Sequence, residues 1–529
     1  MEPILSIVAS GPKIIFPTIQ YRAVGPEIIL VVGTLVIMMV TSLFPGTKKT
    51  KVPMVLALLT AVISLADSIA MWSNFTAHGA YRAIASSIVV DGFAVFALIT
   101  ISSIVVLSVL LGEAYLHESG FGVAEFLSLL LLSAAGGMLL ASAGDLIVVF
   151  LGLEILSIAL YVLAAFEKRS SSSGEAGLKY FLLGGFSSAI FLYGIALTYG
   201  ATGSSNLSKI AAFLAANTLT SNGVLLAGMS LLIVGLAFKV AAVPFHLWTP
   251  DVYQGAPSAA VGYMAAVAKV AGFAGLLRIL LTAFPTLRYD WQPVIWTLAV
   301  LSLVVGAILA VVQSDLKRML AYSSINHAGF VLLGVEAATA KGASASLYYL
   351  IAYAFMIIAT FAIVNTFEDK ETGTVPIERL RGLASRNPAI AFFLAVLLVA
   401  QAGAPLTTGL LAKFSVVSAA VNAHSYALAI IAMLSAVVAT FFYLRVVTVA
   451  YSKSPRRRAR LGAREVVLSD GSVALASAGE ATGGTEVLTK VSMPLEAQIV
   501  VGLGVGFTVI FGIFPNLILH MADMAKLLF

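Results

Sequence analysis

Long apolar segments, separated by short polar stretches, follow one another through almost the whole chain. A helix that crosses a bilayer needs about 20 predominantly apolar residues, and fourteen segments reach that length, with boundaries good to a few residues. They are 25–44, 52–72, 88–111, 123–142, 144–166, 177–200, 222–247, 257–283, 294–312, 318–337, 344–367, 389–421, 426–450 and 497–519. This pattern predicts an all-α polytopic membrane protein with fourteen transmembrane helices.

Two of these segments carry helix-breaking residues close to a lysine. The twelfth, 389–421, is too long for one straight span and contains Pro405 before Lys413. The seventh has Pro244 soon after Lys239. Proline removes a helical hydrogen bond and clashes with the preceding turn, so we expect broken helices 7 and 12. Paired interrupted helices in two halves of opposite topology point to a transport site near the membrane midplane.

The composition agrees with a membrane protein and narrows the chemistry. Of 529 residues, 60% are hydrophobic and 11% charged, whereas a soluble domain is about 45–50% apolar and about 25% charged. The chain has no cysteine, which excludes disulfides, thiol catalysis and iron–sulfur ligation by cysteine within it. We find no phosphate-binding glycine loop, nucleophile triad or metal-ligand spacing. Any active transport must therefore draw on an ion gradient or on another subunit.

The basic residues predict the orientation. If the N-terminus lies outside, 18 of the 31 Lys and Arg residues fall in cytoplasmic loops, 7 lie outside and the remainder lie within spans. Cytoplasmic loops of membrane proteins carry such an excess of positive charge. We therefore expect a bacterial plasma membrane protein with both termini on the periplasmic side. The polar loop 451–496 would be a flexible cytoplasmic connector whose basic start contacts membrane lipid rather than nucleic acid.

Four ionisable residues lie deep in apolar segments: Glu154, Lys239, Lys269 and Lys413. An ionisable group at the bilayer centre costs at least about 2.5–3.5 kcal/mol on insertion scales, so such groups usually face the bundle interior and mark ion pathways. Lysine can release its proton when buried, whereas arginine stays charged. The row therefore predicts a proton relay in which Glu154 pairs with Lys239. The structural alternative is a static buried ion pair that only fixes helix packing.

Three further residues are candidates for a more peripheral relay. Lys179 lies near one end of its span and could instead extend to the cytoplasmic surface. His246 lies between Pro244 and Pro250 and could carry protons toward Lys239, or simply sit at the lipid interface. His327 has midplane depth and polar neighbours, which favours a hydrated path over a packing role.

Other charged residues near span ends have simpler interpretations. Arg278 and Arg445 are expected to reach the lipid interface with their long side chains. Asp315 and Lys317, in the sequence QSDLKRM, are expected to form an interfacial charge cluster.

Several long motifs resemble a known family. They are LGLEILSIALYVLAAF, GLKYFLLGGFSSAIFLYGIALTYGATGS, LAFKVAAVPFHLWTPDVYQGAPSAAVGYMAAVAKVAGF and QSDLKRMLAYSSINHAGFVLLG. Such motifs are similar to those of the antiporter-like membrane subunits of respiratory complex I, the NADH–quinone oxidoreductase. The resemblance runs from about residue 25 to 450 and again over the last span. Of the L, M and N types, the wording GLKYFLLGGF and PDVYQGAP looks like the N type. The M type typically has a glutamate where this chain has Lys413.

The resemblance implies a fold with two inverted five-helix repeats, spans 4–8 and 9–13. With these repeats, the expected divisions are an N-terminal three-helix segment 1–122, the repeats 123–283 and 294–450, the loop 451–496, which the resemblance does not cover, and 497–529 with the last span. Proton transfer is carried over onto Glu154, Lys239, Lys269 and Lys413, with Lys179, His246 and His327 as secondary relay positions. NADH, FMN, iron–sulfur clusters and quinone would bind to partner subunits, which include the L- and M-type subunits, and no cofactor or metal to this chain.

The expected function is that of a proton-translocating subunit that couples quinone reduction elsewhere in a complex to proton pumping. The main alternative is a subunit of a multi-subunit sodium/proton antiporter, which has the same helices and no redox partner. A membrane scaffold without transport is a third interpretation, but it leaves the buried ionisable row without a purpose.

Overall fold

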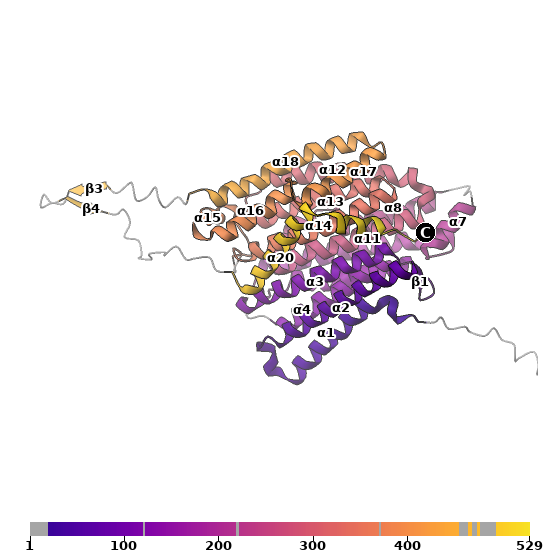
Figure 1. The fold of residues 1–529 in the computed structure, drawn as a ribbon, viewed down its shortest axis with the longest axis horizontal. Coiled ribbons are helices and arrows are strands. Elements are labelled where there is room, and N and C mark those ends of the chain that lie inside the picture. Colours follow the sequence, from indigo (N-terminus) through magenta and orange to yellow (C-terminus); the bar gives the residue numbers. More distant parts are fainter. Residues whose placement is uncertain are drawn as a thin grey trace, which may run out of the picture.

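The computed structural model describes residues 19–119, 122–217, 222–369, 372–453, 464–467, 473–476 and 493–528. Most of them are helical (Figure 1). The helices of the first half are η2 Tyr21–Val24, α1 Gly25–Leu43, η3 Pro45–Lys49, α2 Val52–His78, α3 Gly92–Ser119, α4 Val123–Ser142, α5 Leu146–Ala164, α6 Ser171–Thr202, α7 Leu207–Ala216, α8 Gly223–Lys239, α9 Trp248–Gly255, α10 Ser258–Tyr263, η4 Met264–Ala268, α11 Lys269–Arg278 and η5 Ile279–Ala283.

The second half continues with the same kind of element. Its helices are η6 Pro285–Leu287, α12 Arg288–Val311, α13 Leu316–Glu336, α14 Ala340–Asn365, η7 Ile377–Leu380, α15 Leu383–Arg386, α16 Pro388–Ala402, α17 Thr408–Asn422, α18 Tyr426–Tyr451, α20 Leu495–Ile513 and α21 Asn516–Met524. Two short antiparallel strand pairs join β1 Tyr81–Ala83 to β2 Ile88–Val90, and β3 Arg464–Val467 to β4 Val473–Ala476. The remainder of the predicted connector 451–496 lies largely outside the described residues.

Eleven helical stretches among the described residues are long and apolar enough to cross a membrane, and four shorter apolar helices accompany them. The predicted class, a helical polytopic membrane protein, is confirmed at this level. The number of fourteen spans, the inverted repeats and the divisions of the chain stay predictions. The ends of the bundle are marked by α15 on one side and by α7, β1 and the C-terminus on the other (Figure 1).

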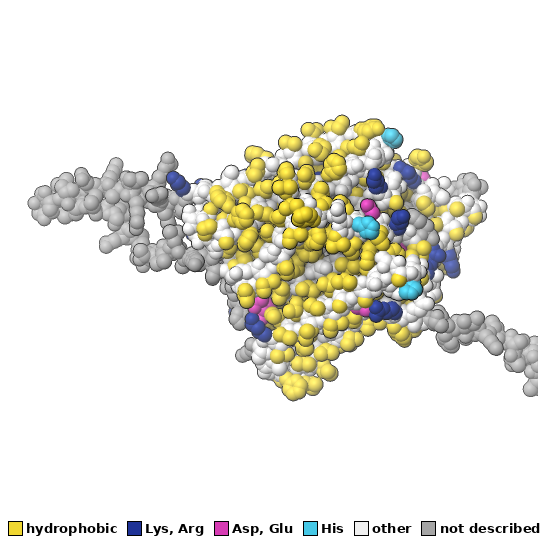
Figure 2. All heavy atoms as spheres, in the orientation of Figure 1, with side chains coloured by type: hydrophobic (Ala, Val, Ile, Leu, Met, Phe, Trp, Pro, Cys, Tyr) yellow, Lys and Arg dark blue, Asp and Glu magenta, His cyan; other side chains and the backbone are white. Residues whose placement is uncertain are grey.

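Burial divides the helices into an inner and an outer set. The most apolar stretches of α10–η5 and α14 are 94% buried, while those of α1 and α20 are 33% and 28% buried. A helix that is apolar all round belongs either in a core or against lipid. The outer helices expose large apolar side chains, which cover much of the molecular surface in Figure 2. The inner set is therefore where buried polar groups must find partners within the protein.

Two helix ends fall inside the bundle. Helix α8 ends at Lys239, and the chain is irregular up to Trp248, with Ala241 at a φ of 59°. Helix α16 ends at Ala402, where Gly403 takes a left-handed φ of 102°, and α17 starts at Thr408. A helix end leaves its last four carbonyls without helical partners. These two ends therefore place carbonyl oxygens, which need partners from outside their own helix, in an apolar interior.

Candidate functional site

The three lysines predicted from the apolar segments are all buried. Lys239 is 3% exposed, Lys269 4% and Lys413 6%. They lie at the end of α8, at the start of α11 and within α17. A buried ammonium must have hydrogen-bond acceptors close by, so the partners of each lysine define the site.

Lys239 has hydroxyl partners rather than a carboxylate. Its Nζ donates to Ser157 Oγ at 2.9 Å and to Tyr180 Oη at 3.4 Å. The ammonium also lies 5.6 Å from the centre of the Tyr180 ring, and that ring stacks on Trp248 at 4.4 Å. Cation–π attraction adds to the hydrogen bonds. Tyr180, backed by Trp248 from the first turn after the break, thus forms one wall around the Lys239 ammonium.

Glu154 lies on the edge of the same cluster. It is half-buried, beside the exposed side chains of Leu151 and Ile155, and accepts a hydrogen bond from Ser188 of α6. The ion pair predicted between Glu154 and Lys239 does not form in the described structure. Ser157, about one helical turn further along α5, takes the Lys239 ammonium instead. Glu154 and Lys239 still lie near each other, because each bonds to a serine of the same group, Ser188 or Ser157. The expected proximity of the two charges is therefore found, but the expected direct ion pair is not.

Lys269 is held by main-chain oxygens. Its Nζ donates to Val240 O at 3.2 Å and to Ser324 O at 2.6 Å. Val240 directly follows the last residue of α8, and the C-terminal end of a helix carries partial negative charge that favours a cation. The π-helical turn η4 comes immediately before Lys269. Such turns occur frequently at functional sites.

His327 lies at the centre of a set of buried hydroxyls. Its Nδ1 and Nε2 are 2.6 and 2.9 Å from the hydroxyls of Tyr349 and Tyr443. Tyr443 also contacts Ser323 and, at 3.4 Å, the amide oxygen of Gln401 in the last turn of α16. This set runs from α13 to the second helix break. It has the polar continuity that a hydrated relay requires.

Lys413 completes the row at that break. Its Nζ donates to Ala402 O at 2.8 Å and lies 4.8 Å above the Phe330 ring. Ala402 is the last residue of α16, so Lys413 uses a helix-end carbonyl as Lys269 does. A Cβ on Gly403 would come within 3.2 Å of Lys413 Cδ. Glycine at this position supplies both the left-handed turn and the room for the lysine stem.

The secondary candidates fall in different places. Lys179 forms ion pairs of 2.7 Å with Glu175 and with Asp251, and its side chain is 41% exposed. His246 is 8% exposed, and its Nδ1 has no hydrogen-bond partner among the described residues. Lys179 is therefore a partly exposed group in the third turn of α6, whereas His246 lies inside the irregular segment after Lys239.

A family model described as NADH:quinone oxidoreductase/Mrp antiporter, TM, matches residues 143–439, more than half of the chain. The chain belongs to this family. All four residues of the predicted main row, Glu154, Lys239, Lys269 and Lys413, lie within the matched range.

Similar proteins whose subunit type is known indicate which kind of subunit within this family the chain resembles. The chain is 40% identical to an NADH-quinone oxidoreductase subunit N of Trichlorobacter lovleyi over 83% of this chain and 89% of that one. It is 35% identical to a subunit N of Parafrankia sp. over 99% of both. A chain of respiratory complex I from Thermus thermophilus with bound aureothin has 30% identity and a TM-score of 0.72, covering 94% of this chain and 98% of that chain.

A chain of the Mrp complex from Dietzia sp. shares the fold, with a TM-score of 0.79 at 21% identity, over 95% of this chain and 96% of that one. Its lower identity supports the fold alone. The closer sequence relatives confirm the prediction of an N-type antiporter-like subunit. The chain is thus a proton-translocating membrane subunit of NADH-quinone oxidoreductase, which is a translocase. The interpretation as a membrane scaffold without transport is not supported.

The expectation that Arg278 reaches the lipid interface was wrong, whereas Lys317 does lie in a charge cluster. Arg278 is fully buried and forms two hydrogen bonds with Asp91, at 2.9 and 3.0 Å. Lys317 is also fully buried and donates to Glu368, Ala256 O and Gly373 O. Their partners lie 187 and 51 positions away from them in sequence. Local sequence could not show that distant acids neutralise these cations.

Arg445 is half-buried and donates to Val311 O at 2.7 Å, at the C-terminal end of α12, rather than to the lipid interface. Arg278 Nε likewise donates to Ala141 O, in the last turn of α4, at 2.9 Å. Four cations therefore share one kind of anchor, the helix-end carbonyl: Lys269, Lys413, Arg278 and Arg445. This arrangement recurs because helix C-termini attract positive charge.

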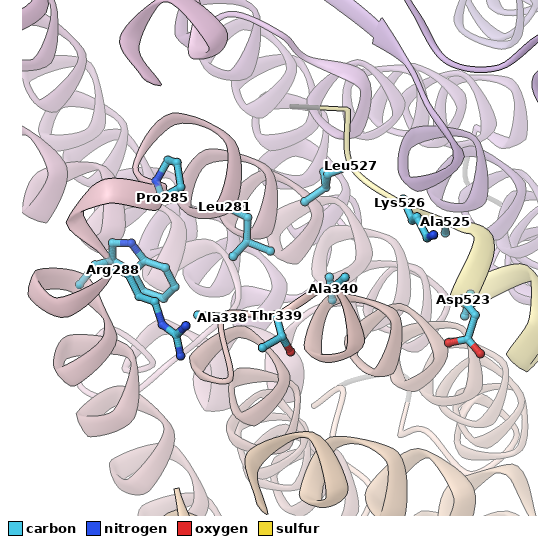
Figure 3. A pocket seen from close by; sticks show the side chains of 13 residues that line it. Leu281, Pro285, Arg288, Ala338, Thr339, Ala340, Asp523, Ala525, Lys526 and Leu527 are labelled. Carbon is cyan, nitrogen blue, oxygen red and sulfur yellow. The ribbon is translucent and has the colours of Figure 1, made fainter. Parts of the chain in front are cut away.

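Near Arg278, the C-terminal residues close a hollow of about 440 Å³ at the end of the bundle that also holds α7 (Figure 3). Leu281, Arg288, Thr339, Lys526 and Leu527 are among the residues that line it. The main-chain N–H of Leu528 donates to Asp91 at 2.9 Å. The C-terminus thus contributes directly to the buried Asp91–Arg278 pair.

Some uncharged residues that contact the predicted row were not predicted. Tyr180, Tyr349, Tyr443 and Gln401 make contacts that join the charged groups. Gln401 could have been found from the sequence, because it is an amide side chain inside a broken apolar segment. The tyrosines could not, since tyrosine is too common in apolar segments to indicate a polar contact. Among the described residues, no group of three His, Asp or Glu side chains is placed to hold a metal ion.

Proposed function

We propose that the buried row from Glu154 through Lys239, Lys269 and His327 to Lys413 carries protons across the membrane within a larger NADH-quinone oxidoreductase. The observation that supports this most is the spacing of its hydrogen-bonding groups. Hydroxyls, main-chain carbonyls and a histidine separate one buried ammonium from the next across the inner helices. Buried ionisable groups within membrane spans typically mark such relays.

The coupling in this proposal is electrostatic. Two unit charges about 4 Å apart interact by about 4 kcal/mol at an effective dielectric constant of about 20, and the interaction falls as the distance grows. A change of charge near Glu154, caused by quinone chemistry in partner subunits, alters the field at Lys239 through the Ser157 and Ser188 cluster. The lysines then pass protons in turn, because each ammonium repels charge on the next.

Several finer assignments belong to the same proposal. Both termini lie on the periplasmic side of a bacterial inner membrane, as the basic residues indicate. NADH, FMN, iron–sulfur clusters and quinone bind to other subunits, and the L- and M-type subunits are membrane partners. Lys179 and His246 act at the periphery of the relay. The fourteen spans and the inverted repeats 123–283 and 294–450 supply its two broken helices.

The direct test uses the complex purified through a tag on this chain and reconstituted in liposomes. Lys269→Met should abolish or strongly reduce NADH-driven acidification of the lumen, because methionine fills a similar volume and cannot hold a proton. Lys209→Met, at an exposed lysine of α7, is the matched control and should pump normally. Normal proton-to-electron stoichiometry in Lys269→Met would sink the proposal. Sodium-dependent proton exchange without quinone reduction would move the chain to the antiporter class.

A second variant tests the input of the row. Glu154→Gln keeps the shape and the contact with Ser188 but removes the carboxylate charge. If the field from Glu154 sets the state of Lys239, pumping falls strongly while the complex still assembles. Unchanged pumping in this variant would remove Glu154 from the mechanism.

A further inference from the structure

The hollow of about 440 Å³ beside the C-terminus combines apolar walls with two basic groups (Figure 3). Leu281, Trp291 and Leu527 supply much of the apolar wall, and Arg288 and Lys526 lie on opposite sides of the space. Pockets that bind small molecules typically measure about 300–1,000 Å³ and place a few polar groups in an apolar lining. The size and lining of the hollow are therefore those of a site for a molecule with one charged and one apolar part.

Arg288 forms no ion pair with a carboxylate among the described residues. Its Nε donates to Gln292 Oε1 at 3.3 Å and its Nη2 to Ala337 O at 3.5 Å, and both acceptors are neutral. Glu336, one residue before Ala337, accepts from Ser425 at 3.1 Å instead. A guanidinium has five N–H donors, so Arg288 can still donate to an anion in the hollow.

Lys526, on the other side, is exposed and also forms no ion pair within the part of the chain that the structure describes. Among the described lining residues, Asp523 is the one carboxylate, and it accepts from Ser344 at 2.7 Å. Two cations and one carboxylate leave the lining with a net positive charge. Thr339 and Ala340 add the N-terminal end of α14, where helix N–H groups favour an anion.

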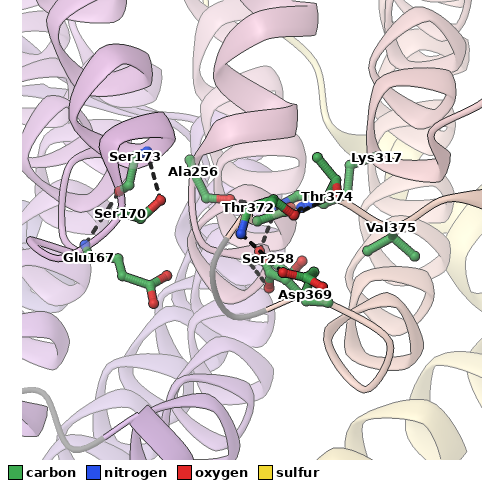
Figure 4. Close-up of polar contacts among 12 residues, drawn as sticks. Glu167, Ser170, Ser173, Ala256, Ser258, Lys317, Asp369, Thr372, Thr374 and Val375 are labelled. Atoms are coloured by element: carbon green, nitrogen blue, oxygen red, sulfur yellow. Dashed lines mark hydrogen bonds and ion pairs between the residues drawn. The ribbon is translucent and has the colours of Figure 1, made fainter. Parts of the chain in front are cut away.

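Two buried cations, Lys317 and Arg278, show the contrast. Lys317 pairs with Glu368 at 2.6 Å and donates to Ala256 O at 2.7 Å (Figure 4). Arg278, close to the hollow, is bonded to both carboxylate oxygens of Asp91. The chain thus supplies its own acids for these cations. It supplies none for the two cations of the hollow, where an anion from outside can take that place.

The surroundings of the hollow indicate the level of the lipid headgroups. Tyr289, next to Arg288, is 87% exposed, and aromatic side chains gather where membrane and water meet. Further along α12, Val294 and Ile308 are exposed apolar side chains. Basic side chains gather toward the end of the molecule that holds the C-terminus, beside a wide apolar surface (Figure 2). Positive charge and apolar surface therefore lie together in a way that matches an anionic phospholipid.

We propose that the hollow binds the phosphate group of an anionic phospholipid of the phosphatidylglycerol type, with Arg288 and Lys526 as its two cationic contacts. Arg288 donates N–H bonds to phosphate oxygens, for which its planar fork is suited, and Lys526 adds a second positive charge. The acyl chains lie against the exposed apolar side chains of α12. The lipid thereby joins the start of α12 to the C-terminal residues. The inference goes beyond the proposed proton row and does not depend on it.

The first experiment locates the lipid on the chain by photo-crosslinking. The purified complex is incubated with a phosphatidylglycerol that carries a diazirine on its acyl chain, near the glycerol, and the labelled peptides are identified by mass spectrometry. Label is expected on the start of α12 and on the C-terminal peptide that contains Lys526. An excess of unmodified phosphatidylglycerol should remove this label, whereas equal amounts of phosphatidylcholine or sodium phosphate should not.

Three other results would contradict the proposal. Equal competition by phosphatidylcholine would show that the charges do not select the lipid. Competition by sodium phosphate alone would identify the hollow as a site for a free anion. Absence of label from both segments would show that the hollow is closed to lipid, as it would be if a neighbouring subunit fills it.

The second experiment measures the two cationic contacts. Arg288→Gln and Lys526→Gln should each raise the concentration of the diazirine lipid needed for half-maximal labelling about 10-fold, the loss expected for one hydrogen bond to a charged group. Lys209→Gln, at an exposed lysine of α7 at the same end of the bundle, is the matched control and should label like the native chain.

The NADH–quinone activity of each variant complex checks that it has assembled. Because Lys526 is exposed, its variant reports on binding even if Arg288→Gln disturbs assembly. Native labelling in Lys526→Gln, or an equal loss in Lys209→Gln, would refute the assigned contacts. Labelling does not involve pumping, so this site and the proton row are decided separately.

Discussion

The buried pair of Asp91 and Arg278 gives the strongest stability prediction. Arg278 is bonded to both carboxylate oxygens, and the two side chains are 0% and 1% exposed. Asp91→Ala would leave the guanidinium in the interior with Ala141 O as its remaining hydrogen-bond acceptor in the described structure. Removing one partner of a buried pair typically destabilises a protein by about 3–5 kcal/mol, because the other charge stays uncompensated.

The structure also predicts an asymmetry between the two partners. If Arg278 is replaced by methionine, Asp91 still accepts from the backbone N–H groups of Ala94 and Leu528, at 2.8 and 2.9 Å. A carboxylate with two such donors is better compensated than an arginine with one carbonyl. We therefore expect Arg278→Met to destabilise less than Asp91→Ala. The double variant Asp91→Leu with Arg278→Met should recover much of the loss, since apolar packing can replace a buried pair.

Detergent-purified complex offers the assay. Denaturation of this chain is followed by limited proteolysis across a series of sodium dodecyl sulfate mole fractions in mixed micelles, for the native protein and the three variants. Native proteins are stable by only about 5–15 kcal/mol, so a loss of about 3–5 kcal/mol shifts the midpoint visibly. An Asp91→Ala midpoint equal to that of the native chain would refute the argument. A double variant as unstable as Asp91→Ala would refute the role assigned to the uncompensated charge.

Three further predictions concern single contacts. Gly403→Ala should destabilise the chain by about 1–3 kcal/mol, because a non-glycine residue is strained at the left-handed φ of Gly403. The added Cβ would also crowd Lys413, so the pumping rate and the denaturation midpoint should fall together. Tyr443→Phe removes the hydroxyl that joins the buried histidine to the broken helix, so pumping should drop while the midpoint stays close to native. At the surface, a hydrogen bond to Glu496 and the charge of its carboxylate raise the pKa of Lys51 above its usual 10.5. The Lys51–Glu496 contact therefore stabilises the folded chain below pH 10.5, and this stabilisation is lost as the pH rises through the raised pKa. A Glu496→Gln chain should have a lower denaturation midpoint than the native chain below that range and an equal midpoint above it; a midpoint lowered equally at all pH values would contradict this. The difference should be small and weakened by salt.

Sequence alone could predict the depth of the key charges but not their partners. Lys239, Lys269 and Lys413 stand out because an apolar stretch predicts burial whatever lies around it. The anchors of Lys269 and Lys413 are carbonyls, which every residue possesses and which no side-chain pattern marks. The contact of Lys239 with Ser157 rather than with Glu154 depends on side-chain reach across α5 and α8, which spacing along the chain does not reveal.

The misplaced Arg278 has a similar explanation. Arg278 lies near the end of its segment, and position alone suggests the interface. Its partner Asp91 was visible inside the predicted segment 88–111, yet only the three-dimensional arrangement brings α3 and α11 together. Helix extents were easier, because apolar length and breaking residues are local properties. The interruptions after Lys239 and Ala402 fall where Pro244, Gly403 and Pro405 stand.

The helix-end carbonyls that hold Lys269, Lys413, Arg278 and Arg445 have a consequence for how this protein can change. A main-chain carbonyl oxygen does not titrate and is not removed by a side-chain substitution. These hydrogen-bond acceptors therefore do not change with pH, and few substitutions can remove them. What alters them is displacement of the main chain at a helix end. Small inhibitors or engineered cross-links that immobilise the breaks after Lys239 and Ala402 would therefore fix the positions of these cations without replacing any lysine.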